Sequence, residues 1–247
     1  MSFLSMLFFH LKNTATQSYF FFLVLMNAVS LLLLQYIGSF ANNHLLSGRA
    51  VATSVLFGIW NSAVTAAGIL HFQRNQGVLV YLVNASKNPR TALLALISSS
   101  STFGLIALPI VFGLAFLLNG CSMPFISSQV VFGMLLFWLS ALPITYVLAS
   151  LFLLSRHAFV YEGLCVLPLL LISGLLGPLF PSGSFLDVLS YLLPMRLPIR
   201  LVLFSDWPCW WFWAIWLIDI SLFLFASDAL FRKILLRIRV SAELEVL

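Results

Sequence analysis

Residues 19–40 read YFFFLVLMNAVSLLLLQYIGSF and contain no Lys, Arg, Asp or Glu. A helix needs about 20 predominantly apolar residues to cross the hydrocarbon core of a bilayer. Lipid offers no partner for backbone N–H and C=O groups, whereas a helix satisfies these groups internally. Residues 19–40 therefore predict a transmembrane helix.

The rest of the chain repeats this pattern. The whole sequence is 62% hydrophobic and 8% charged, whereas a globular domain carries about 25% charged residues. Five further stretches are long and apolar enough to span a bilayer: 51–70, 93–118, 130–154, 159–179 and 207–231. The sequence thus predicts an all-α integral membrane protein in which residues 1–247 form one transmembrane domain with six transmembrane helices, largely surrounded by membrane lipid.

Residues 1–17 have a different pattern from the spans. Their larger apolar side chains recur at helical spacing, at Phe3, Leu4, Leu7, Phe8 and Leu11. An amphipathic helix of this kind lies in the membrane interface rather than across it. We therefore expect an N-terminal interfacial helix before the first span.

The distribution of positive charge predicts the orientation. With six spans, nine of the 12 Lys and Arg residues fall on the side that holds both termini, and the other side holds Arg49, Arg196 and Arg200. Cytoplasmic loops carry an excess of Lys and Arg. We therefore expect a multi-pass protein of the cell membrane with both termini in the cytoplasm. The net charge of +5 is a topology signal, and no nucleic-acid partner is expected.

Two connections are not simple turns. Residues 71–90 are polar, basic and longer than a turn between two spans requires, so they have room for a short surface helix. Residues 180–206 combine Pro181, Pro194 and Pro198 with many apolar residues. That composition favours a helix pair that dips back into the outer side of the membrane, where protein or water covers its broken backbone.

The first of these connections resembles the coupling region of ABC-2 type permeases, the transmembrane subunits of ABC transporters. That family has a Glu-Arg pair, then Gly-Thr-Leu, then small residues and a proline before the third span. Here residues 73–79 read QRNQGVL and residues 85–90 read ASKNPR. The positions that match are Arg74, Gly77, Leu79 and Pro89, whereas Gln73 and Val78 depart from the pattern. Because Gln73 stands where the family has Glu, any salt bridge that family members make from this Glu has no counterpart here.

The second half of the chain is also similar to this family, so the resemblance covers nearly the whole chain. Residues 167–174 read LPLLLISG and run into Gly177-Pro178, and residues 192–194 read LLP, followed by Arg196 and Arg200. Family members have an N-terminal interfacial helix, six spans, a cytoplasmic coupling helix between spans two and three, and an external re-entrant helix pair before span six. All four features have counterparts in the predicted layout.

The resemblance implies how such a chain would work. It implies two permease subunits, identical or homologous, and two cytoplasmic ABC ATPase subunits that supply the energy. No G-x-x-x-x-G-K-[ST] loop occurs in this sequence, so we expect ATP to be bound by the partner ATPase. The chain itself is predicted to have no enzymatic activity and no cofactor. In the region 71–90, Leu79 is expected to face the ATPase, so that Leu79→Asp would disturb docking without disturbing folding.

Two acidic residues are candidates for the transport path or for gating. Asp219 lies near the middle of the sixth span, where an acidic side chain costs about 3 kcal/mol to insert and marks a functional site by default. A buried structural carboxyl is the alternative. Glu162 lies near the inner end of the fifth span and is interpreted as an anchoring or gating contact. Asp228 stands four residues before Arg232, the spacing of a helical ion pair.

Other classes of function remain as alternatives. A secondary transporter or channel of similar size has the same hydropathy, although inverted repeats and more intramembrane charge are typical of secondary carriers. An intramembrane enzyme is disfavoured, because the four histidines lie at span ends or outside the spans and no G-x-S-x-G motif occurs. The three cysteines have no metal-ligand spacing. The few polar groups in the spans favour an apolar or amphipathic cargo, such as a peptide, drug, lipid or lipid-linked glycan.

Overall fold

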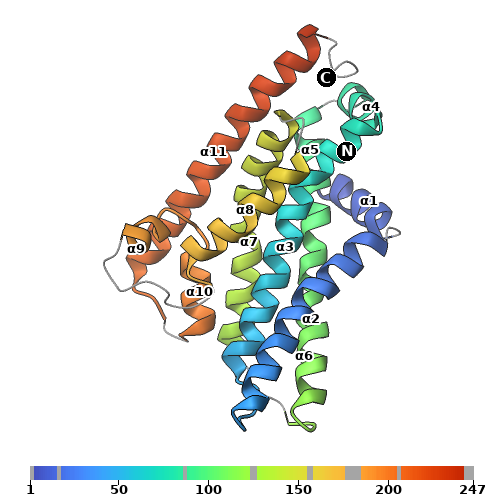
Figure 1. Cartoon of the computed structure of the whole chain (residues 1–247). Coiled ribbons are helices and arrows are strands. Elements are labelled where there is room, and N and C mark those ends of the chain that lie inside the picture. The colour runs from blue at the N-terminus through green and yellow to red at the C-terminus, as the bar shows by residue number, and fades with distance from the viewer. Residues whose placement is uncertain are drawn as a thin grey trace.

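The structure is a computed structural model that describes residues 3–15, 18–85, 88–122, 127–154, 158–175, 185–204 and 207–241. Every regular element in these residues is a helix (Figure 1). Five helical segments are long and apolar enough to cross a membrane: Phe21–Ala41, Gly48–Asn75, Pro89–Leu118, Ser128–Leu154 and Trp210–Leu235. The prediction of an all-α chain with several membrane-spanning helices is thereby confirmed.

The predicted fifth span, 159–179, is described in part. It begins as α8 (Ala158–Ser173), a helix of 16 residues, whereas about 20 are needed to cross the hydrocarbon core. Residues 176–184 lie outside the described part of the chain. The structure therefore supports five spans by length and composition. A crossing by the predicted fifth span, 159–179, stays a prediction.

Helix α3 (Gly48–Asn75) is the central element of the bundle. It contacts α2 (Ser18–Ala41), α5 (Pro89–Thr102) and α7 (Ser128–Leu154), and Figure 1 shows it surrounded by these helices. Small residues allow the close approach. A Cβ atom added to Gly58 would lie 2.7 Å from the Cβ of Ala28 and 2.9 Å from the Cβ of Ala107.

The third span is broken in its middle. Helix α5 gives way to a short 3-10 helix, η1 (Phe103–Ile106), and then to α6 (Ala107–Leu118). Pro109 has no N–H for the carbonyl four residues earlier, and its ring clashes with that carbonyl. The tighter 3-10 turn just before Pro109 is a common response to such strain. Two further prolines, Pro143 and Pro168, lie within continuous helices.

Two helices expose most of their surface. In α2 and in α11 (Trp210–Ser241) only 17% of the residues in the most apolar 18-residue stretch are buried. Their exposed side chains include Phe22, Leu34, Leu217 and Phe225. Helix α11 packs mainly against α7 and runs obliquely along one side of the bundle (Figure 1). Surfaces this apolar fit contact with lipid or with another membrane helix.

The two ends of the bundle differ. Helices α1 (Phe3–Ala15) and α4 (Val78–Ala85) and the end of α11 lie at one end, whereas the connections after α2 and α6 lie at the other (Figure 1). At that second end, Asn119 and Leu46 exchange hydrogen bonds of 3.1 and 3.2 Å. The region 180–206 contains α9 (Phe185–Ser190) and α10 (Arg196–Leu203), beside the start of α11.

Candidate functional site

The chain between α3 and α5 turns at Gly77 and then forms α4. Gly77 has a φ of +71°, a left-handed conformation that glycine adopts without a steric cost. Its N–H donates to the carbonyl oxygen of Arg74 at 2.9 Å. Helix α4 spans Val78–Ala85, so a helix of eight residues occupies the predicted coupling region.

Helix α4 has one buried and one exposed face. Leu79 is 0% exposed and Val83 is 3% exposed, and both belong to the main core. Val78 is 44% exposed and Tyr81 is 76% exposed. The expectation that Leu79 faces outward is therefore wrong, because this side chain anchors α4 to α3 and α5. The outward apolar face consists of Val78, which departs from the family pattern, and Tyr81, which lies outside that pattern.

The other residues of the predicted coupling set tie this region to the bundle. The guanidinium of Arg74 donates a hydrogen bond of 3.0 Å to the backbone carbonyl of Leu153, in the last turn of α7. Pro89 is the first residue of α5, where its missing N–H removes no helical hydrogen bond. Arg74 thus links the ends of two spans.

An ion-pair cluster lies beside this region. Asp228 on α11 accepts a hydrogen bond of 2.8 Å from Arg232, which confirms the predicted pair, and it also pairs with Arg90 at the start of α5 at 3.1 Å. The second contact, between residues 138 positions apart, was not predicted, since spacing within one helix carries no information on partners in another. The cluster joins α5 to α11.

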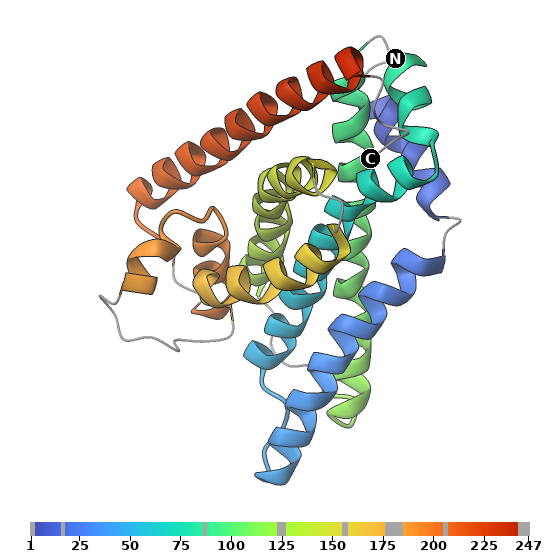
Figure 2. The same cartoon turned by 45° about the horizontal axis from the view of Figure 1, so that its top comes forward.

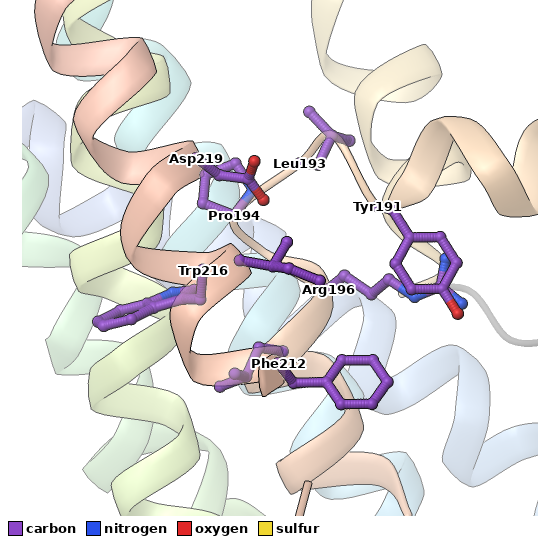
Figure 3. A pocket seen from close by; sticks show the side chains of 9 residues that line it. Tyr191, Leu193, Pro194, Arg196, Phe212, Trp216 and Asp219 are labelled. Carbon is purple, nitrogen blue, oxygen red and sulfur yellow. The ribbon is translucent and has the colours of Figure 1, made fainter. Parts of the chain in front are cut away.

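The second candidate site surrounds Asp219 on α11. This residue is 9% exposed and lines a cavity of about 20 Å³ together with residues of α10, α11 and the segment before α10. A cavity of this size holds about one water molecule. Figure 3 shows the carboxylate beside Pro194 and Leu193. Within the described residues, it accepts no hydrogen bond and forms no ion pair.

Aromatic rings and one cation, Arg196, line other parts of this cavity. The Arg196 guanidinium lies over the ring of Tyr191, with its Cζ 3.3 Å from the ring centroid, and it reaches toward this ring in Figure 3. Trp216 donates a hydrogen bond of 2.8 Å to the hydroxyl of Ser140. Cation–π contacts and such bonds fix the wall positions. The site therefore presents one acidic group, Asp219, and one guanidinium, Arg196, in a mostly apolar wall.

The predicted site residues fall into two separate groups. The walls of the Asp219 cavity come from α10, α11 and the segment before α10, so α4 contributes none of them. Glu162 lies on α8, but its side chain is outside what the structure describes, and no contact is assigned to it. Among the described residues, no group of three or more His, Cys, Asp or Glu side chains could hold a metal ion.

The chain was also compared with known proteins. No model of a protein family, no curated protein and no solved structure matches it.

Proposed function

We propose that this chain is the membrane-spanning subunit of an ABC exporter of the ABC-2 type, which moves an apolar or amphipathic substrate across the cell membrane. A separate ATPase binds and hydrolyses ATP on the cytoplasmic side, and a second permease subunit, identical or homologous, completes the path. The proposal rests on the sequence resemblance and on the exposed face of α4.

The observation that carries the proposal is the exposure of Val78 and Tyr81 on α4. Nine of the 12 Lys and Arg residues fall on the predicted side of this helix, and an apolar face there fits a protein partner. Leu79 and Val83 fix the opposite face of α4 in the core. A partner that binds Tyr81 and moves α4 therefore also moves the parts of α3 and α5 that contact α4.

The proposed coupling follows from these contacts. ATP binding closes the ATPase subunits and displaces α4. Through α5 the displacement reaches the 3-10 turn in the middle of the third span. Through Arg74 on α3 it reaches the end of α7. ATP thereby shifts the population between inward-open and outward-facing states, as a ligand does when it binds two states with different affinity. Asp219 and Glu162 are proposed as transport-path or gating residues.

The experiment uses the tagged chain, expressed in the organism that naturally produces it, and the chain is cross-linked to its partners before purification. Tyr81→Asp places an unpaired charge in the proposed interface, which costs several kcal/mol if that interface forms, so we expect loss of the co-purified ATPase with normal membrane insertion. The control is Leu45→Asp, since Leu45 is 73% exposed at the opposite end of the bundle.

Three outcomes would contradict the proposal. The first is full ATPase association and transport by the Tyr81→Asp variant. The second is ATP hydrolysis by the rigorously purified chain alone. The third is transport that needs an ion gradient and no ATPase, which would establish the secondary transporter as the correct class.

A further inference from the structure

An open groove runs between α1 and the break in the third span. Its volume is about 700 Å³, within the roughly 300–1,000 Å³ of sites that bind small ligands. One wall consists of Phe8, Leu11, Lys12 and Ala15 on α1, and their spacing places them on one face of the helix. The other wall includes Phe103 and Pro109.

The lining of the groove is complementary to an amphiphile, a molecule with an apolar chain and a charged head group. Its lining is apolar apart from Thr102 and Lys12, and Lys12 carries the only charge. The described part of α1 contains no acidic residue to compete for that lysine. Burial lowers the pKa of His10 below its ordinary value, so His10 is neutral at pH 7 and Lys12 is the sole cation of the helix.

The groove is open to the surroundings of the bundle, and the exposed apolar side chains beside it fit contact with lipid. Phe8 lines it and is 65% exposed, and the neighbouring Phe9 is 64% exposed, as in a helix lying in the membrane interface. Figure 2 shows α1 set against α5. A ligand that diffuses in the bilayer therefore reaches the groove laterally.

We propose that this groove is a binding site for an anionic phospholipid, with an acyl chain between α1 and η1 and the phosphate at Lys12. Basic pockets between transmembrane helices bind anionic head groups in this way. The site lies apart from α4 and from the Asp219 cavity. The groove shares η1 with the proposed coupling path, but none of its lining residues belongs to α4, so lipid retention and ATPase association can each fail alone.

The first test measures lipid retained by the purified full-length chain, using native mass spectrometry with phosphatidylglycerol and phosphatidylcholine of identical acyl chains. The wild type should prefer phosphatidylglycerol, and Lys12→Gln should weaken its retention about fivefold, the effect of one lysine near an anionic lipid. Lys12→Arg should restore it. The control is Lys233→Gln, because Lys233 is exposed on α11 and does not line the groove.

The second test locates the lipid with a photoreactive phosphatidylglycerol whose diazirine is at the acyl terminus. Labelling should concentrate on residues 8–15 and 102–109, and Ala15→Trp should reduce it, because the larger side chain occupies part of the groove beside Lys12. Equal labelling of the exposed face of α2 would overturn the proposal, as would equal retention of both lipids or equal losses in the Lys12 and Lys233 variants. Cross-links from this groove to a second copy of the chain would also overturn it.

Discussion

At the scale of single residues, Asp219 offers a test that separates function from stability. The side chain has a cavity of about one water beside it and no described partner, so removing its charge breaks no ion pair there. Asp219→Leu should raise the thermal stability of the purified chain, because inserting the acid costs about 3 kcal/mol. The same variant should lose transport, as should Asp219→Asn.

The control for this prediction is Asp228→Asn, which removes a carboxylate with two arginine partners. Asp228 is 40% exposed in its side chain, and exposed pairs contribute about 1 kcal/mol or less, so its stability should fall slightly. If Asp219→Leu is less stable than the wild type and still transports, the carboxyl is structural.

A second prediction at this scale concerns Gly58. The Cβ of an alanine there would meet the Cβ atoms of Ala28 and Ala107, and both are fixed to helix backbones. Gly58→Ala should therefore lower the stability by about 1–3 kcal/mol through overpacking. Thermal unfolding in one detergent measures this. Gly113→Ala is the control, since nothing lies within 4 Å of its Cβ position, and it should be neutral or stabilising by up to about 1 kcal/mol.

At the scale of elements, the sequence predicted the existence of helices better than their faces. Five of the six predicted apolar stretches correspond to helices long enough to span a membrane, because length and composition alone decide whether a helix can cross lipid. The orientation of α4 could not be predicted in the same way. Residues 78–83 read VLVYLV, so every position is apolar and no periodicity marks which side is buried. Packing against α3 and α5 decides that Leu79 is inside and Tyr81 outside.

The broken third span illustrates the same limit. A proline inside a span, such as Pro109, is a common cause of a kink, but its position in the sequence gives no sign that the 3-10 turn forms one wall of a groove with α1. The two walls are separated by about 90 residues in the chain, and a single sequence carries no information on such pairs. The sites at Asp219 and Lys12 differ in this respect: the first was visible from its depth in a span, the second only from the packing.

At the scale of the whole molecule, the charge distribution gives the bundle a polarity. Arg49, which donates two hydrogen bonds to the carbonyl of Leu203, lies in the first turn of α3, and α3 begins at the end of the bundle opposite α1 and α4 (Figure 1). Arg74 lies in the last turn of α3 and Arg90 in the first turn of α5, and α4 lies between these two helix ends in the chain. Because the excess of positive charge marks the cytoplasmic side, the end with α4 should face the cytoplasm, where an ATPase could reach Tyr81.

Cysteine labelling tests this orientation and the number of spans together. Cys121 and Cys209 are exposed and flank α7 and α8 in the chain. If both helices cross the membrane, the two thiols lie on the same outer side, and a membrane-impermeant maleimide should label each single-cysteine variant in intact cells. Asn84→Cys on α4, in a chain with its own cysteines replaced by serine, should react only after permeabilisation.

If only one of Cys121 and Cys209 reacts, α8 does not cross, and the layout has five spans. If Asn84→Cys reacts in intact cells while the other two do not, the orientation is reversed and α4 cannot meet a cytoplasmic ATPase.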